Sequence, residues 1–201
     1  MRLPETGDAD ARQRQLTRMG NAAGGAALSL LMAGSTAEAN EWFARAIERY
    51  RESYELAPPG SWGRLIAILK ADILSGDWDG AKTDAHWTLE QDVARVESPI
   101  GRYAATLALL VLGRDAEARI LADELRTHDG FPTDVGDALA MIAAEDVVDY
   151  IEAIESVLAS FETRDEYLED LPVADTVVVL QALARRRDMA AELESELLPA
   201  G

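Results

Sequence analysis

A short pattern, glycine followed five residues later by alanine, occurs three times in this chain and restricts its fold more than any other feature. The three copies are Gly34–Ala39, Gly76–Ala81 and Gly113–Ala118. In each copy an apolar segment precedes the glycine and another follows the alanine. Glycine tolerates the left-handed backbone that ends many helices, and alanine allows two helix backbones to approach closely. The pattern therefore predicts repeated helical hairpins, each with a tight turn at its glycine.

Capping residues and helical periodicity mark the borders of these hairpins. Ser61 and Ser98 each precede an apolar segment and are typical N-caps, the second followed directly by proline. Residues Ala39–Tyr54 carry apolar side chains three or four positions apart, with charged residues on the opposite face. The sequence Pro58–Gly60 separates this helix from the next hairpin.

Two further hairpins are expected after the third glycine. In the fourth, Glu145 takes the place of the turn glycine, and an acidic connection around Glu162–Asp170 leads to the fifth. The run Val177–Leu180 has strand-like composition, but an isolated strand would have no partner, so we expect a helix there. The sequence thus predicts an all-α fold, a right-handed array of about five antiparallel helical hairpins. The helices of the last two pairs are expected at Thr133–Ala144 and Asp146–Phe161, and at Asp175–Arg186 and Asp188–Leu198.

Length and composition favour a single domain. The chain has 201 residues, of which 48% are hydrophobic, enough for a sizeable core. We expect a flexible N-terminus at residues 1–9 and one domain at 10–201. The first ten residues are polar and acidic, unlike a secretory signal, which predicts a cytoplasmic protein. The uncharged stretch Met19–Ala37 contains too many small and polar residues for a membrane span and is expected to be a buried helix.

Net charge excludes several classes of partner. The chain has 37 acidic and 19 basic residues, a formal charge of −18, and its only lysines are Lys70 and Lys82. Because phosphate binding needs clustered basic residues, we expect no nucleic acid and no membrane partner. Two explanations of the acidity remain open. One is adaptation to a salt-rich cytoplasm, as in halophilic organisms, and the other is a partner with a basic face.

No catalytic, metal or cofactor residues are expected. Cysteine is absent, and His86 and His128 are too far apart in sequence for a local metal motif. The spacing of Asp77, Asp79 and Asp84 matches no calcium loop. A small enzyme or ligand carrier with a pocket inside the helical stack is an alternative, but it would need converging polar groups for which the sequence has no motif. We therefore expect a protein that is not an enzyme.

The hairpin pattern resembles the tetratricopeptide repeat (TPR) over roughly residues 20–128. In that family the second helix carries alanine, three residues, a large aromatic, two residues and alanine, which Ala39, Phe43 and Ala46 match. The second copy has Ala85 and Thr88 in the last two places, and the third has Ala122 and Leu125. The turn glycines lie 42 and 37 residues apart, whereas the family period is about 34. The chain thus resembles a degenerate TPR-like protein.

The resemblance implies a partner-binding face. TPR arrays commonly hold a peptide on a concave surface lined by the first helix of each pair. On the second and third pairs this implies that a protein or peptide partner contacts Trp62, Arg64, Lys70, Arg102 and Tyr103. The same helices also carry many aliphatic residues, so the groove could instead be filled, or paired with a second copy in a homodimer. The resulting hypothesis is a non-enzymatic protein-binding or peptide-binding scaffold.

A second resemblance concerns the end of the chain. Asp175–Arg187, followed by Ser195–Pro199, is similar to the C-terminus of a family of polymorphic-toxin immunity proteins, the group numbered forty-nine. It implies an alternative function, neutralisation of a toxin through the acidic surface. Salt-dependent affinity for a basic toxin would then be expected.

Two further features have both a structural and a functional interpretation. The tryptophans Trp42, Trp62, Trp78 and Trp87 have helical surroundings typical of a core, but Trp78 lies in a turn beside two aspartates. Arg185–Arg187 is the only dense basic patch. It can meet an acidic surface or phosphate, or it can stabilise the C-terminus of a helix.

Overall fold

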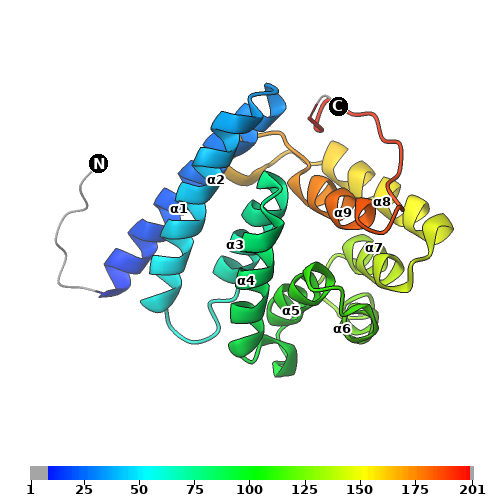
Figure 1. Cartoon of the computed structure of the whole chain (residues 1–201), viewed down its shortest axis with the longest axis horizontal. Helices are drawn as coiled ribbons and strands as arrows, with labels where there is room; N and C mark the ends of the chain where they lie inside the picture. Colours follow the sequence, from blue (N-terminus) through cyan, green and yellow to red (C-terminus); the bar gives the residue numbers. More distant parts are fainter. Residues whose placement is uncertain (1–8, 200–201) are drawn as a thin grey trace.

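The computed structural model describes residues 9–199. All regular secondary structure in this part of the chain is helical (Figure 1). The predicted all-α class is therefore confirmed. The α-helices are α1 (Ala9–Met32), α2 (Thr36–Glu55), α3 (Gly63–Ser75), α4 (Trp78–Glu90), α5 (Pro99–Val111), α6 (Asp115–Leu125), α7 (Thr133–Ala144), α8 (Val147–Glu162) and α9 (Asp175–Arg185), and two short 3-10 helices are η1 (Val93–Arg95) and η2 (Leu168–Asp170).

Consecutive helices from α1 to α8 pack against one another, and α3 also packs against α5. The three repeat glycines end α1, α3 and α5 with positive φ angles of 76°, 75° and 69° at Gly34, Gly76 and Gly113. Glu145 takes the same left-handed conformation between α7 and α8, with φ 55°. The predicted turns are thus confirmed, including the one without glycine.

The predicted helix starts are confirmed in one case and wrong in the other. Ser98 is the N-cap of α5, with proline at the first helical position, although its side chain makes no capping hydrogen bond. Ser61 is not a cap, because α3 begins after Trp62. The Ser61 hydroxyl instead donates a hydrogen bond of 2.7 Å to the carbonyl of Pro58, closing the preceding loop.

The first helix is longer than expected, and the N-terminal segment is only partly described. The uncharged stretch, expected as one buried helix, forms the second half of α1, the turn at Gly34 and the first residues of α2. Within α1 only Gly20, Ala23 and Ala27 of this stretch are buried. The expected flexible residues 1–9 lie outside the described residues apart from Ala9, which is helical. No helix between residues 9 and 199 is long and apolar enough to cross a membrane.

The prediction of a second helix in the fifth hairpin, at Asp188–Leu198, is wrong. Asp188 has a φ of 56°, which ends the helical path after α9. The Gln181 side chain then holds the following chain at Ala191, donating to its carbonyl at 2.6 Å and accepting from its N–H at 3.0 Å. The Ala174 N–H donates to the Leu197 carbonyl at 2.9 Å. These bonds replace helical ones, so residues 188–199 run back along α9 as an irregular C-terminal segment.

Helix α9 lies on the inner side of the array instead of extending it. It packs against α3, α7 and α8 (Figure 1), and buries Val177, Leu180 and Leu183 completely. The run Val177–Leu180 is helical, as expected. The first helix of the second hairpin, α3, is thus covered by a helix of the same chain. The sequence alone left open whether the groove beside it was empty or filled.

Candidate functional site

Lys70, predicted to face a partner, is engaged inside the fold. Its ammonium donates to Asp175 Oδ2 at 2.6 Å and to Thr176 Oγ1 at 3.0 Å. The Lys70 and Asp175 side chains are 16% and 22% exposed. Burial acts to lower the pKa of Lys70, but the charges of Asp175 and Tyr103 outweigh it and raise the pKa above its usual value. This ion pair joins α3 to the start of α9.

Two more of the predicted residues, Tyr103 and Arg64, also face inward. Tyr103 is 8% exposed, and its hydroxyl is buried with no hydrogen-bond partner among the described residues. Burial raises the pKa of Tyr103 and lowers that of Arg64. The Arg64 Nε donates to Ser53 Oγ at 2.8 Å, and its guanidinium also bonds to Gln13. Arg64 thus connects α3 to α1 and α2.

Arg102 and Trp62 complete the predicted set. Arg102 Nε donates to the carbonyl of Val96 at 3.1 Å, and its guanidinium pairs with Glu124 at 3.2 Å. The Trp62 ring lies against Gly101. Each of the five residues therefore contacts a neighbouring element of this chain. Their role in partner binding stays a prediction, but α9 and these internal contacts occupy the face on which it was based.

A pair of buried carboxyl groups connects α3 to α4. Asp72 and Asp84 are 3% and 2% exposed, and Arg51 from α2 pairs with Asp84. Asp72 Oδ2 receives no hydrogen bond from any donor in the described chain. Burial, followed by the charge of Asp84 and a hydrogen bond between the two carboxyl groups, raises the pKa of Asp72 to about 8. Both groups are shielded from solvent, and the raised pKa places Asp72 to respond to pH.

This pair predicts an unusual dependence of stability on pH. Because the folded-state pKa of Asp72 is raised from 3.8 to about 8, the folded protein binds an extra proton between these pH values. The contribution of protonated Asp72 to the free energy of unfolding is fully present below pH 3.8 and is lost as pH rises through about 8. Asp72→Asn cannot ionise, so at pH 9 it should be more stable than the wild type by about 2 kcal/mol or more.

Urea unfolding of the two proteins between pH 4 and 9 measures this difference. Asp79→Asn is the control, because the Asp79 side chain is 97% exposed and its replacement should leave the pH profile of the wild type unchanged. Parallel profiles for Asp72→Asn and the wild type would show that Asp72 titrates normally.

A small cavity of about 210 Å³ lies between α1, α2, α3 and the segment around η2. Its polar groups are largely bonded to one another. The Tyr50 hydroxyl donates to Asn21 Oδ1 at 2.9 Å, and Asn21 Nδ2 donates to Glu169 at 3.2 Å. A short hydrogen-bonded chain along this cavity therefore connects α2, α1 and η2.

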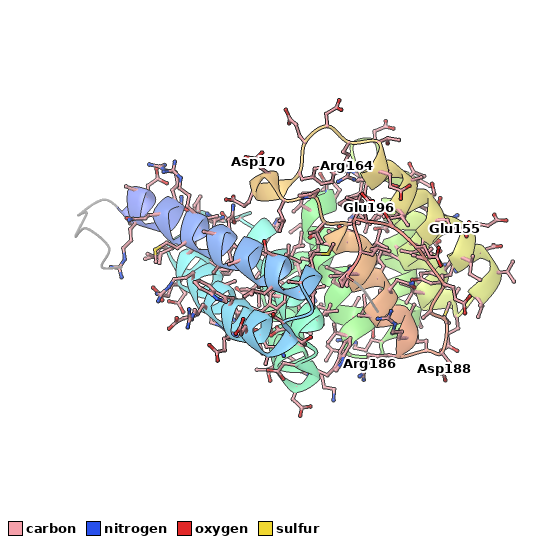
Figure 2. All side chains as sticks on the ribbon, turned by 90° about the horizontal axis from the view of Figure 1, so that it is seen from above. Glu155, Arg164, Asp170, Arg186, Asp188 and Glu196 are labelled. Carbon is pink, nitrogen blue, oxygen red and sulfur yellow. The ribbon has the colours of Figure 1, made fainter. Side chains whose placement is uncertain are left out.

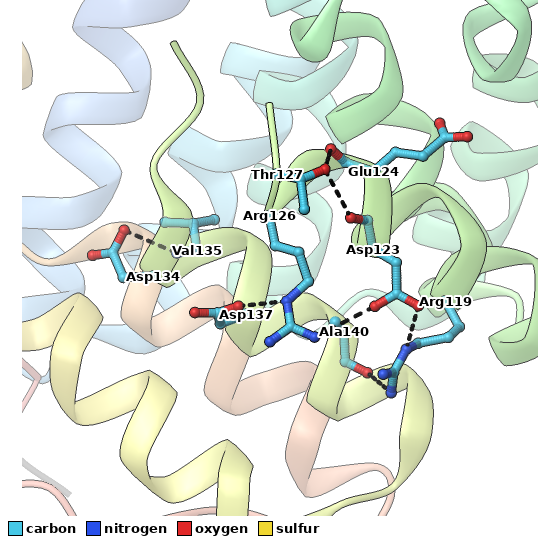
Figure 3. A network of polar contacts seen from close by, with 9 residues as sticks. All are labelled: Arg119, Asp123, Glu124, Arg126, Thr127, Asp134, Val135, Asp137 and Ala140. Atoms are coloured by element: carbon cyan, nitrogen blue, oxygen red, sulfur yellow. Dashed lines mark hydrogen bonds and ion pairs between the residues drawn. The ribbon is translucent and has the colours of Figure 1, made fainter. Parts of the chain in front are cut away.

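An acidic groove of about 330 Å³ runs along α7 and α8. Four carboxylates line it, two from each helix, together with Arg126 from the end of α6. Figure 3 shows that Arg126 is already used, because its Nε donates to Asp137 at 2.6 Å. The other lining carboxylates have no ion pair with a described residue. The groove is lined by Arg126, Asp134, Asp137, Met141, Asp149, Glu152, Ala153 and Ser156.

An exposed aliphatic strip adjoins this groove on α8. Val148 is 70% exposed, Val147 43% and Ile151 37%. The residues one or two turns further on, such as Ile154 and Val157, are fully buried. Glu152 stands four residues after Val148, so the strip and the groove are neighbouring faces of one helix. We call Val147, Val148 and Ile151 the α8 strip.

A third opening, of about 640 Å³, lies where the α1–α2 and α3–α4 turns meet α9 and the C-terminal segment. Trp78 lines it, with the Arg186 guanidinium 4.3 Å from the ring centroid. All four tryptophans are partly buried against the core, as the helical surroundings of the other three predicted. Trp78, expected in a turn, is the first residue of α4. Arg187 is also structural, since it bonds to Asp115 and to the Leu110 carbonyl.

Metal chemistry finds no support in the described residues. Between residues 9 and 199 no group of three or more histidine, aspartate or glutamate side chains is placed to hold a metal ion. The His128 ring bonds to the carbonyl of Asp129 at 2.6 Å, and His86 is exposed.

The exposed residues of the α8 strip were not among the candidate site residues expected from the sequence. A signal for them was present, because acidic residues alternate with the aliphatic ones at Asp149, Glu152 and Glu155. On a helix, Val148 shares a face with Glu152 and Glu155 and not with Ile154.

No protein family model matches the sequence, and no curated protein or solved structure is significantly similar to it.

Proposed function

We propose that this chain is a non-enzymatic protein-binding module with a right-handed TPR-like arrangement of hairpins, and that it binds its partner on the outer surface of α7 and α8. The single observation that carries the proposal is the α8 strip beside the acidic groove. Val148 is 70% exposed at the centre of this surface. The last helix of a helical array normally has a polar outer face, because nothing covers it.

The proposed partner is a protein segment with basic and apolar side chains. Four carboxylates in the groove attract basic groups, and the α8 strip offers apolar area for burial. The outer surface is favoured over the expected concave face because α9 packs against α3 and ion-pairs to it through Lys70 and Asp175. The toxin-neutralising alternative uses the same acidic surface, with a basic toxin as partner. Both proposals therefore share one test.

The test compares four proteins for capture of a partner from native cell extract and then for affinity toward the purified partner. Val148→Ser/Ile151→Ser removes the apolar strip, and Asp149→Asn/Glu152→Gln removes charge from the groove. The matched control, Glu41→Gln/Ala44→Ser, makes similar changes on the exposed face of α2. Calorimetry at low and high salt then gives the affinities.

We expect each of the first two variants to weaken binding by about tenfold or more, and the control to leave it unchanged. The charge variant should also reduce the dependence of binding on salt. A partner that all four proteins bind equally would contradict the proposal, as would a partner with an acidic surface. Identification of the bound partner as a toxin would favour the immunity function over a general scaffold.

A further inference from the structure

The cleft beside α9 has the size of a small-molecule site. Its volume of about 640 Å³ is within the range of roughly 300–1,000 Å³ that such sites occupy. It lies away from α8 and the acidic groove, between the ends of α1 and α3, α9 and the C-terminal segment. The residues that line it are Leu31, Thr36, Ile73, Leu74, Ser75, Gly76, Trp78, Val178, Gln181, Ala182, Arg185, Arg186, Ala191, Leu193, Leu198 and Pro199.

Aliphatic side chains form most of its wall. They come from α1, α3, α9 and the C-terminal segment, as Leu31, Leu74 and Leu193 illustrate. The Gln181 amide, which also lines the cleft, is already engaged with Tyr150 and Ala191. An extended apolar group would therefore find hydrophobic contacts on several sides and few unsatisfied polar groups along the wall.

Two unpaired arginines stand at the same cleft. Arg185 and Arg186 have no ion pair with any residue from 9 to 199, although the chain carries a net charge of −18. Arg187, the next residue, is paired with Asp115. Arg185 and Arg186 stand at the C-terminal end of α9, where positive charge favours the helix dipole, but no carboxylate of residues 9–199 pairs with them. Figure 2 shows Arg186 at the end of α9, at the opposite edge of the molecule from Arg164 and Asp170. Arginine left unpaired beside an apolar cleft suits a carboxylate or phosphate.

Two further details agree with an anionic ligand. The Arg186 guanidinium lies over Trp78, which holds it at the cleft while its N–H groups remain free to donate. The first residue of α2, Thr36, lines the same cleft, and the preceding N-cap Ser35 makes no side-chain capping bond. The N-terminus of a helix carries a partial positive charge that favours anions.

We propose that this cleft binds an amphiphilic anion: a single aliphatic chain inserted among the leucines, with its carboxylate or phosphate held by Arg185 and Arg186. The aliphatic wall selects the chain, and the two guanidinium groups select the charge. Binding here is independent of the protein partner proposed for α8, because the two surfaces share no lining residue.

The test uses isothermal calorimetry with three probes of equal chain length: decanoate, decyl phosphate and uncharged decanol. Arg185→Gln/Arg186→Gln removes the two positive charges and should fold, since neither side chain makes a hydrogen bond or ion pair in the described chain. Arg12→Gln/Arg18→Gln is the matched control, because these exposed arginines of α1 also lack ion pairs. Ala182→Phe narrows the cleft without changing its charge, and circular dichroism confirms that it folds.

We expect one of the two anions to bind at least about tenfold more tightly than decanol. The preferred anion shows whether the natural head group is a carboxylate or a phosphate. Arg185→Gln/Arg186→Gln should lose about tenfold or more of this affinity, and the α1 control none. The proposal is overturned if neither anion binds to the wild type. It is also overturned if Arg185→Gln/Arg186→Gln binds both anions with the same affinity as the wild type. A folded Ala182→Phe protein that binds like the wild type would place the ligand outside the cleft.

Discussion

Lys70→Ala should lower the free energy of unfolding by about 3–5 kcal/mol, because it leaves Asp175 as a largely buried carboxylate without its partner. The pair is the principal charged contact between α3 and α9, at 2.6 Å. Lys70 remains protonated at all pH values near neutrality, since its pKa is raised. The loss should therefore be the same at pH 6 and pH 8. Denaturant unfolding followed by circular dichroism measures it.

The double substitution Lys70→Met/Asp175→Leu separates the ion pair from burial itself. It removes both charges and keeps apolar volume, so it should recover most of the stability that Lys70→Ala loses. Lys82→Ala is the matched control, because the pair of Lys82 with Asp79 has side chains 49% and 97% exposed. Removing that pair should cost less than about 1 kcal/mol. If Lys70→Ala costs no more than Lys82→Ala, α9 is not held by this contact.

Gly136→Ala should destabilise the protein by about 2–3 kcal/mol, because it forces two backbones apart. A Cβ at this position would lie 2.7 Å from the Arg126 Cα and 2.8 Å from its backbone nitrogen. These are main-chain atoms at the end of α6, where the Arg126 side chain also pairs with Asp137 (Figure 3). Neither α6 nor α7 can move without disturbing that contact.

Gly63→Ala is the control for this substitution. Nothing lies within 4 Å of a Cβ added there, and alanine is a better helix former than glycine, so stability should stay equal or rise by up to about 1 kcal/mol. Thermal unfolding of both variants gives the comparison. Equal stabilities for Gly136→Ala and Gly63→Ala would mean that α6 and α7 adjust without cost.

The local part of the fold was predictable from sequence. Gly34, Gly76 and Gly113 end helices in the left-handed conformation, as their position between apolar segments indicated. Even the turn at Glu145 was placed correctly, because the apolar segments on both sides defined the hairpin. Helix ends and turns depend on residues that are close in the chain, so the amino-acid pattern is enough to predict them.

The C-terminal part was not predictable in the same way. Residues 188–198 have a composition that suits a helix, but Gln181 bonds to Ala191 and holds them in an irregular path. That side chain reaches across ten residues, a tertiary contact that periodicity does not reveal. The docking of α9 against α3 depends on contacts across more than 100 residues, such as the one between Lys70 and Asp175.

The candidate sites follow the same division. The resemblance implied that Lys70 and Tyr103 contact a partner, but Lys70 pairs with Asp175 of α9 and the Tyr103 hydroxyl is buried within the chain. Trp78 and Arg186 were recognised as unusual separately, from a turn and from a basic run, and only the fold brings them together. The exposure of Val148 was indicated by the acidic residues that share its helix face, Glu152 and Glu155, but the groove beside it depends on the packing of α7 against α8.

The central claim is that α9 permanently closes the inner face of the array, which leaves the outer surface of α7 and α8 for a partner. Native-state hydrogen exchange at increasing denaturant tests it most directly. We expect the amides of Val177–Ala184 to exchange only through global unfolding, with the same free energy of opening as the amides of α5. A separate opening of α9, at a free energy well below that of α5, would contradict the account and make the concave face available for binding.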